Sequence, residues 1–519
     1  MKTDFKNNRP KGFNSKEDRF LIPIINGMEK LIASTQNQYV YDTIKLDKKL
    51  RQILSTLLIE FAEDLHCEIG LWKSLEFYNK QLFDTPLPLF VNNENEIKES
   101  FDVNRIKYFI HNIFFEFDPE LIMAPNHNDL DLLSKNISEF LTEKFQNVPR
   151  ISGIKEFLSQ PNDFGWDFKR KLVWIGINSF LFRLSFNRYI VETNKGKMEI
   201  ASIDDFVCQE NTIWSGLGVT DLLAKTLDLP EKINNGVRSW YERYTSYYRV
   251  ISSIDSTLIL ENIINETEYK VRLDTGQSKI FKVGNIIFGG IAPYGDYWYW
   301  SGVQHDCGKL DKINIDKLKK DFGRSASRII YRYDKQLLSK AQEIIKQHHS
   351  DFVSFFGSDL MIFKDGLSMA AALQKKDRKK YESLSKEELE AHMKKHGLEN
   401  PFPKMNLPDE LLNSENGVGV YFNPDEGIEM MFGFDDLISG FKKNGAALSY
   451  DEGEAIRNFI TSDAISPKFV KMMIDKYGAK SINDSFCINS EITNVNYLLR
   501  KYKGQYFRNK YPEITLTDD

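Results

Sequence analysis

The side-chain pattern of this chain changes abruptly over residues 247–303. Elsewhere, apolar residues recur at intervals of three and four, which is typical of amphipathic helices. Within this segment, β-branched and aromatic residues alternate with polar ones in short runs, and the runs are separated by turn residues such as Asp274 and Gly276. Alternation of this kind indicates strands. We predict strands at residues 247–254, 257–261, 267–273, 279–283, 286–291 and 297–303.

The number and spacing of these predicted strands are similar to those of SH3-like and OB-like barrels, which close a few short strands into one small sheet. The predicted fold class is therefore α+β: a mostly α-helical multidomain protein with a central small SH3/OB-like β-barrel. This resemblance concerns the strand pattern alone, and a fold of this kind serves many functions.

The chain has 519 residues, and a single hydrophobic core stops growing at about 250–300 residues. We therefore predict several domains. The pattern divides the chain into an N-terminal mainly helical region (1–245), the small β-barrel (246–305), a helical region with a charged linker (306–400) and a C-terminal helical domain with a basic and aromatic tail (401–519).

Local signals refine the helical regions. We predict one long helix at residues 166–189, and then a short hairpin at 191–200 that turns at Asn194-Lys195-Gly196. A short strand is expected at residues 360–363. Residues 404–500 are predicted to be helical, with helix starts at Ser449, whose partner is Glu452, and at Ser466-Pro467.

Composition restricts the compartment and the partners. The 69 basic and 74 acidic residues give a net charge of -5, which argues against a dedicated duplex-DNA binder. The four cysteines are far apart and form no C-x-x-C pair, so we expect reduced thiols in a cytoplasmic protein. No signal peptide and no membrane span of about 20 apolar residues is apparent. The abundance of Lys, Asn and Ile would suit an AT-rich bacterial genome.

Four consecutive aromatic residues end the predicted barrel. Trp298 and Trp300 lie on one face of the strand, and Tyr297 and Tyr299 lie on the other, because side chains alternate. One pair should fill the barrel core, so the other should lie outside it or beneath a neighbouring domain. Exposed rings of this kind stack on nucleobases or hold an extended peptide. The alternative role is packing between domains.

A second candidate binding element is the C-terminal segment. Its basic residues are Arg500, Lys501, Lys503, Arg508 and Lys510, of which the first four are the predicted binding residues, and aromatic residues lie between them. Cations interleaved with rings suit a phosphate backbone with unstacked bases. The alternative is a solvated or docked terminal helix.

Catalytic signals are sparse. Phosphate-binding loops and the common hydrolase motifs are missing from the sequence. Asp425, Glu426 and Glu429 are close enough in sequence to hold a magnesium ion, but Asn423-Pro424 also resembles a helix start, where acidic residues are favoured. His305 and Cys307 are too close in sequence to face each other as a catalytic pair.

We therefore predict a non-enzymatic cytosolic binding or adaptor protein that uses the small β-barrel and the basic-aromatic C-terminus. The partner is a protein, which the acidic net charge favours, or single-stranded nucleic acid, including RNA. No cofactor, metal or membrane is expected. The alternative is a metal-dependent hydrolase or nuclease whose site is assembled from dispersed carboxylates, so enzymatic activity stays open. The sequence predicts no oligomeric state.

Overall fold

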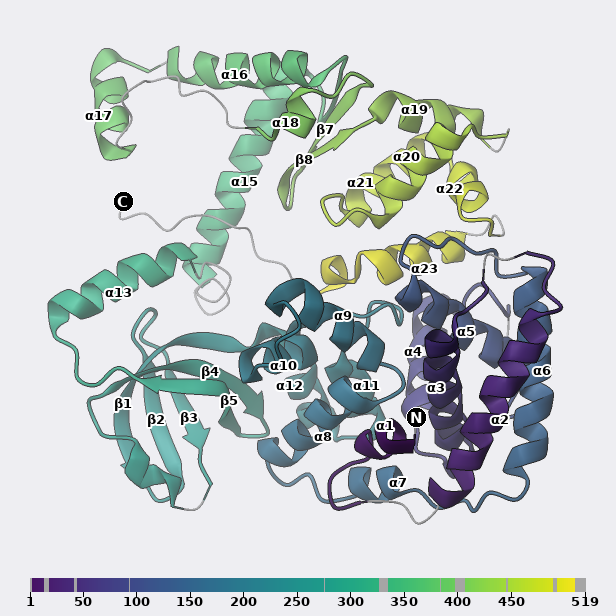
Figure 1. The fold of residues 1–519 in the computed structure, drawn as a ribbon. Coiled ribbons are helices and arrows are strands. Elements are labelled where there is room, and N and C mark those ends of the chain that lie inside the picture. The colour runs from purple at the N-terminus through teal and green to yellow at the C-terminus, as the bar shows by residue number, and fades with distance from the viewer. Residues whose placement is uncertain are drawn as a thin grey trace. The chain divides into compact units, whose positions relative to one another are not determined.

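The chain is described by a computed structural model in which it forms two compact units, Met1–Tyr333 and Asp334–Ile514 (Figure 1). The prediction of four parts is finer than this division and stays a prediction. The structure describes residues 2–13, 18–41, 44–92, 94–274, 276–325, 335–382, 384–396, 407–444, 447–488 and 492–508.

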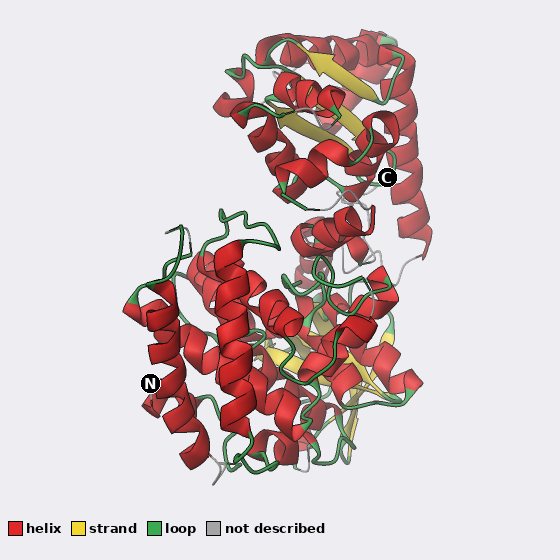
Figure 2. Cartoon of the chain, turned by 90° about the vertical axis from the view of Figure 1, so that its right-hand side faces the viewer, coloured by secondary structure: helices red, strands yellow, loops and turns green. Residues whose placement is uncertain are grey.

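The first unit begins with a helical region whose core is dense in aromatic side chains. The Phe61 ring lies 4.7 Å from both Trp72 and Phe109, measured between ring centroids. This region is a set of packed helices, as Figures 1 and 2 show. They are α1 (Lys2–Asn7), α2 (Asp18–Gln36), α3 (Lys48–Cys67), α4 (Leu71–Phe83), η1 (Glu94–Glu96), α5 (Val103–Phe117), α6 (Asn128–Phe145), α7 (Gly153–Leu158), α8 (Gly165–Asn178), α9 (Arg183–Asn194), α10 (Ile200–Gln209), α11 (Val219–Thr226), α12 (Glu231–Arg238) and η2 (Ser239–Glu242).

Two local predictions in this region are wrong. The single helix at 166–189 is two helices, because Ser179 is extended and separates α8 from α9. The hairpin at 191–200 is the end of α9: Lys195 and Gly196 adopt positive φ, and the Gly196 N–H donates to the Ile190 carbonyl. Hairpin turns and helix C-termini both need residues at positive φ, so the same residues suit either structure.

The predicted barrel is confirmed as a closed five-stranded sheet in the order β1-β2-β3-β5-β4. β1 pairs with both β2 and β4. β3 and β5 are parallel and meet at Val271 and Trp298. The elements are β1 (Tyr244–Ile254), β2 (Thr257–Asn262), β3 (Glu268–Arg272), η3 (Gln277–Ile280), β4 (Ile286–Tyr294) and β5 (Tyr297–Asp306).

The strand expected at 279–283 is wrong, because η3 occupies the start of this segment. Two of its apolar residues stay outside the barrel core, since Ile280 is 67% exposed and Val283 is 56% exposed, and only Phe281 packs against that core. The barrel core comes from the other strands. Its buried members are Tyr248, Val250, Leu258, Leu260, Tyr269, Val271, Leu273, Ile287 and Ile291.

After α13 (Lys312–Ser325), the second unit combines helices with a small antiparallel sheet in the order β6-β7-β8. Helix α15 packs against this sheet through Phe352, which contacts Phe422. The elements are α15 (Lys335–Phe356), β6 (Leu360–Phe363), α16 (Gly366–Glu382), α17 (Lys386–His396), α18 (Asp409–Leu412), β7 (Val418–Asn423), β8 (Gly427–Phe432), α19 (Phe434–Lys443), α20 (Tyr450–Thr461), α21 (Pro467–Tyr477), α22 (Lys480–Ser485), α23 (Ile492–Tyr502) and η4 (Gly504–Phe507).

The predicted strand at 360–363 and the two predicted helix starts are confirmed. The prediction that 404–500 is all helical is wrong, because β7 and β8 form a hairpin. Every residue of β7 is buried, so the strand lacks the alternation that distinguishes strand from helix. Within the described residues, no helix combines the length and apolar character needed to cross a membrane.

Candidate binding cleft beside the β-barrel

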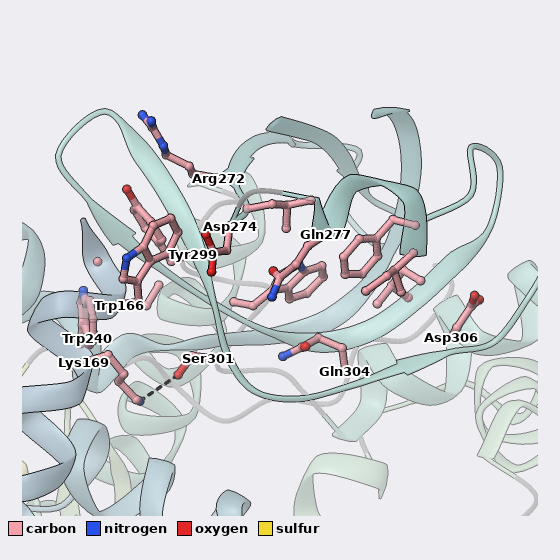
Figure 3. A pocket seen from close by; sticks show the side chains of 17 residues that line it. Trp166, Lys169, Trp240, Arg272, Asp274, Gln277, Tyr299, Ser301, Gln304 and Asp306 are labelled. Carbon is pink, nitrogen blue, oxygen red and sulfur yellow. Dashed lines mark hydrogen bonds between the residues drawn. The ribbon is translucent and has the colours of Figure 1, made fainter. Parts of the chain in front are cut away.

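A cavity of about 520 Å³ lies between the start of α8 and one side of the barrel (Figure 3). We call it the barrel cleft. Rings form much of its wall, and Arg272, Asp274, Gln277 and Gln304 supply polar groups. Its lining residues are Gly165, Trp166, Lys169, Trp240, Arg272, Leu273, Asp274, Gln277, Ile280, Phe281, Ile287, Ala292, Tyr299, Trp300, Ser301, Gln304 and Asp306.

Of the four aromatic residues singled out in the sequence, Trp298 and Trp300 pack against the barrel core. The Trp298 ring lies 5.0 Å from Tyr269. Trp300 stacks on Phe281 at 5.9 Å and also lines the cleft. Both rings are half-buried. Among the residues that the structure describes, the buried Trp300 Nε1 has no hydrogen-bond partner.

Tyr297 and Tyr299 lie on the opposite face of β5 and have different surroundings. Tyr299 is 6% exposed, because it packs beneath the start of α8 with its ring 5.3 Å from Trp166. Tyr297 remains half-exposed. Tyr299 therefore joins the barrel to the helical region, and Tyr297 is the more exposed ring of this pair.

Tyr297 belongs to a cluster of rings and cations that adjoins the cleft through Trp166 and Arg272, which line it. Lys270 Nζ lies 4.7 Å from the centre of its ring, and Arg272 Cζ lies 5.1 Å from it. The Arg272 guanidinium is also 4.7 Å from the Phe164 ring, which stacks on Trp166 at 4.8 Å. We call these five residues the aromatic–cation face.

The half of this face that comes from the helical region was not predicted from the sequence. Phe164 and Trp166 lie more than a hundred residues before β5. The only sequence feature that marks them is one aromatic residue on each side of Gly165. The Phe164 N–H donates to the Asp167 carboxylate at 3.0 Å, so this segment also forms the start of α8. Only the fold brings these rings to β3 and β5.

Buried charges hold the inner end of the cleft together. Lys169 Nζ lies 2.8 Å from Asp204 Oδ1 and 3.1 Å from Ser301 Oγ, and Arg243 Nη1 lies 3.0 Å from Asp204 Oδ2. Burial alone would raise the pKa of Asp204. The two cations and the hydrogen bonds from Lys169 and Ser301 outweigh burial and hold this pKa below its usual value.

This network resembles a Ser–Lys nucleophile in composition, but its hydrogen bonds are those of a structural link. Lys169 donates to Asp204, to Ser301 and to Cys208 Sγ at 3.3 Å. An ammonium with all three protons engaged has no lone pair to accept the Ser301 proton. Ser301 in turn donates to Asp204.

The C-terminal candidate residues lie in the second unit. The Arg500 guanidinium packs over Phe507 at 4.4 Å, and Arg508 is half-buried. Lys501 is 7% exposed and Lys503 is 0% exposed. Lys503 donates to the Ser462 carbonyl, and burial lowers its pKa to about 7. Binding of phosphate by the two lysines stays a prediction that would require their ammonium groups to leave buried positions.

The carboxylates of the alternative metal site do not converge. Asp425 pairs with Lys468 at 2.6 Å. Glu429 is buried in β8 and accepts hydrogen bonds from Asn423 and from the Ser466 N–H, each at 2.8 Å. The helix start expected at Asn423-Pro424 is wrong, because these residues form the β7–β8 turn. Among the described residues, no group of three or more His, Cys, Asp or Glu side chains is arranged to hold a metal ion.

His305 and Cys307 form no catalytic pair. Both residues are exposed. The contact between them joins Cys307 Sγ to the backbone oxygen of His305, at 3.8 Å, rather than to the imidazole.

Comparisons with protein-family models, with curated proteins and with solved structures gave no match for this chain.

Proposed function

We propose that this protein is a non-enzymatic binding protein that captures a short stretch of single-stranded nucleic acid, RNA included, at the barrel cleft. The observation that carries the proposal is the aromatic–cation face. It places the rings of Phe164, Trp166 and Tyr297 within reach of Arg272 and Lys270. Rings stack on unpaired bases of any identity, and adjacent cations contact the phosphates.

The barrel topology supports the same proposal. We propose that the barrel is OB-like rather than SH3-like, because five strands close in the order β1-β2-β3-β5-β4 and η3 lies between β3 and β4. OB-like barrels bind oligonucleotides across the face of their second and third strands. Lys270 and Arg272 lie on β3, where such a ligand would run.

A protein partner at this face is the alternative. The acidic net charge favours a protein. However, every strand of the barrel has two neighbouring strands, which restricts the strand edge available for the main-chain hydrogen bonds on which addition of an extended peptide depends. The rings of the aromatic–cation face can stack on unpaired bases without such hydrogen bonds. We therefore propose that nucleic acid fits this site better than a peptide does.

We also propose a cytoplasmic location. The four cysteines are free thiols in the structure, which suits a reducing compartment.

The test is fluorescence anisotropy with a labelled oligouridylate of about ten nucleotides, a length that matches one OB-like site. Phe164→Ala and Tyr297→Ala should each weaken binding by about 10-fold, because each removes one stacking ring. Phe77→Ala is the matched control. Phe77 is 40% exposed with Lys225 Nζ 4.0 Å from its ring centre, but it lies on α4 outside the cleft.

Salt dependence gives a second readout. With Lys270 and Arg272 as the phosphate contacts, the logarithm of affinity should fall with the logarithm of salt at a slope of about -1.4. Arg272→Gln should halve that slope. If Phe164→Ala and Tyr297→Ala bind as the parent protein does, the proposal is wrong. Magnesium-dependent cleavage of the oligonucleotide, suppressed by a chelator, would favour the nuclease alternative instead.

A further inference from the structure

The second unit contains a larger cavity, of about 620 Å³, between β8 and α20. We call it the β8 groove. Met430, Met431 and Phe432 all line it. Successive side chains of a strand point to opposite faces, so a groove that contacts three consecutive residues runs along the edge of the strand. The other lining residues are Asn416, Gly433, Asp436, Asp451, Glu454, Ala455, Asn458, Thr461, Ser462, Ala464 and Ile465.

β8 is an edge strand. It lies at the end of the β6-β7-β8 sheet and pairs only with β7 among the described strands. Its outer edge therefore presents backbone N–H and C=O groups that have no strand partner. Lysine and proline are among the devices that protect natural edge strands, and β8 contains neither; its one charged residue, Glu429, is buried. Instead, Ile428 is 42% exposed and Phe432 is 58% exposed.

The lining of the groove combines acidic side chains with apolar ones. Asp436, Asp451 and Glu454 line it, and none of its lining residues is Lys, Arg or His. Asp451 and Glu454 are exposed, and neither forms an ion pair with the described residues. Met430 and Met431, which point to opposite faces of β8, both line the groove, and their flexible thioether side chains adapt to different apolar groups. The complementary ligand therefore carries both apolar and cationic side chains.

We infer that the β8 groove binds an extended segment of a partner protein, in which apolar residues alternate with Lys or Arg, and that this segment adds to the free edge of β8. Main-chain hydrogen bonds to β8 would supply affinity. Because Met430 and Met431 point to opposite faces of β8, one face of the added strand would place its apolar side chains beside Met430, which packs on the apolar cluster of this unit. The other face would bring the cations to the carboxylates of α20. A helical ligand satisfies its own backbone groups and has no use for the edge.

The test uses the full chain and a fluorescein-labelled peptide of alternating valine and lysine, about eight residues long. Three comparison peptides have the valines respaced to the helical period, glutamate in place of lysine, or N-methyl groups on alternate residues. We expect the alternating peptide to bind best in anisotropy titrations. N-methylation on the hydrogen-bonding side should weaken it by about 10-fold or more, because each methyl removes a donor.

Two double variants test whether negative charge at the groove, rather than negative charge elsewhere on the second unit, is needed for peptide binding. Asp451→Asn with Glu454→Gln should weaken the alternating peptide by about 2- to 10-fold. Asp475→Asn with Asp484→Asn removes the same charge from exposed positions on α21 and α22 and should have no effect. Both substitutions are nearly isosteric, so the fold is expected to survive.

Hydrogen exchange locates the peptide. Its binding should protect amides of Gly427–Phe432 and leave the barrel strands unchanged. Three results would overturn the inference. The first is unaltered hydrogen exchange in β8. The second is an N-methylated or helically spaced peptide that binds as tightly as the alternating peptide, and the third is an acidic peptide that does so. None of them bears on oligonucleotide binding at the barrel cleft, because that proposal is tested with another probe and other variants.

Discussion

Gly165 lies directly against the ring of Tyr299. A Cβ atom built at position 165 would be 2.7 Å from Cδ2 of that ring, and real Cβ atoms do not approach so closely. Gly165 opens α8 and Tyr299 lies on β5, so the missing side chain lets the helical region and the barrel meet. It also fixes one wall of the cleft.

Gly165→Ala is therefore expected to destabilise the first unit by about 1–3 kcal/mol, because the added methyl overpacks this junction. Urea denaturation followed by tryptophan fluorescence measures the effect, since all seven tryptophans precede residue 301. Gly236→Ala in α12 is the matched control: its Cβ would meet its nearest atom at 4.0 Å. It should be neutral or slightly stabilising. Equal effects at the two positions would contradict the packing argument.

Trp298 and Trp300 should behave differently from Tyr297. We expect Trp298→Ala with Trp300→Ala to weaken ligand capture more than replacement of Glu429, but through loss of the barrel. Truncating a fully buried tryptophan costs about 3–5 kcal/mol, and these half-buried rings should cost somewhat less. Tyr297→Ala should impair binding and leave the urea midpoint nearly unchanged. A double tryptophan variant that keeps parental stability and loses binding would instead place these rings in direct contact with the ligand.

The sequence predicted the parts of the fold that have a local period. Alternation in residues 247–303 located the barrel, and the capping residues Ser449 and Ser466 located two helix starts. Prediction from the sequence was wrong where the same local pattern is compatible with two different structures. Asn194-Lys195-Gly196 suits either a hairpin or a helix end, and the fully buried β7 has no alternation to detect.

The site was less predictable than the fold. Alternation indicated that Tyr297 and Trp298 face opposite ways, but not which pair fills the core. Phe164 and Trp166 join the face only through tertiary contacts. Lys503 reads as a surface cation in sequence, yet it has no exposed surface. Burial of a single charged residue inside a polar segment leaves no periodic signal.

Asp204 should be essential to the link between α10 and the barrel. Asp204→Asn would leave Lys169 and Arg243 as buried cations with a single ionised partner, Asp205, which pairs with Arg243. Breaking a buried ion pair typically costs about 3–5 kcal/mol. Tryptophan fluorescence suits this measurement because Lys169 Nζ lies 5.7 Å from the Trp240 ring centre.

Asp205→Asn is the control for that change, because the Asp205 side chain is 37% exposed whereas that of Asp204 is 5% exposed. Asp205→Asn should lower the free energy of unfolding by well under half as much as Asp204→Asn does, since solvent screens the exposed partner. Similar losses for the two variants would mean that Asp204 is not the centre of the network.

Lys503 should make the stability of the second unit depend on pH. Burial lowers its pKa from the usual 10.5 to about 7. Between these values the unfolded chain keeps the proton and the folded chain releases it, so stability should rise with pH. The expected gain is about 1 kcal/mol per pH unit from pH 7 to 9. Above about pH 10, ionisation of tyrosines such as Tyr502, whose pKa burial raises, opposes this trend.

Lys503→Met should flatten this slope, because methionine fills similar space without a charge. Its absolute stability is a poorer test, since the hydrogen bond to the Ser462 carbonyl is lost as well. The second unit contains no tryptophan, so tryptophan fluorescence reports on unfolding of the first unit only. Unfolding of the second unit is followed by circular dichroism, as the part of the signal change that has no counterpart in fluorescence. Lys471→Met, at an exposed position on α21, should keep the parental slope. A parental slope in Lys503→Met as well would show that another group titrates.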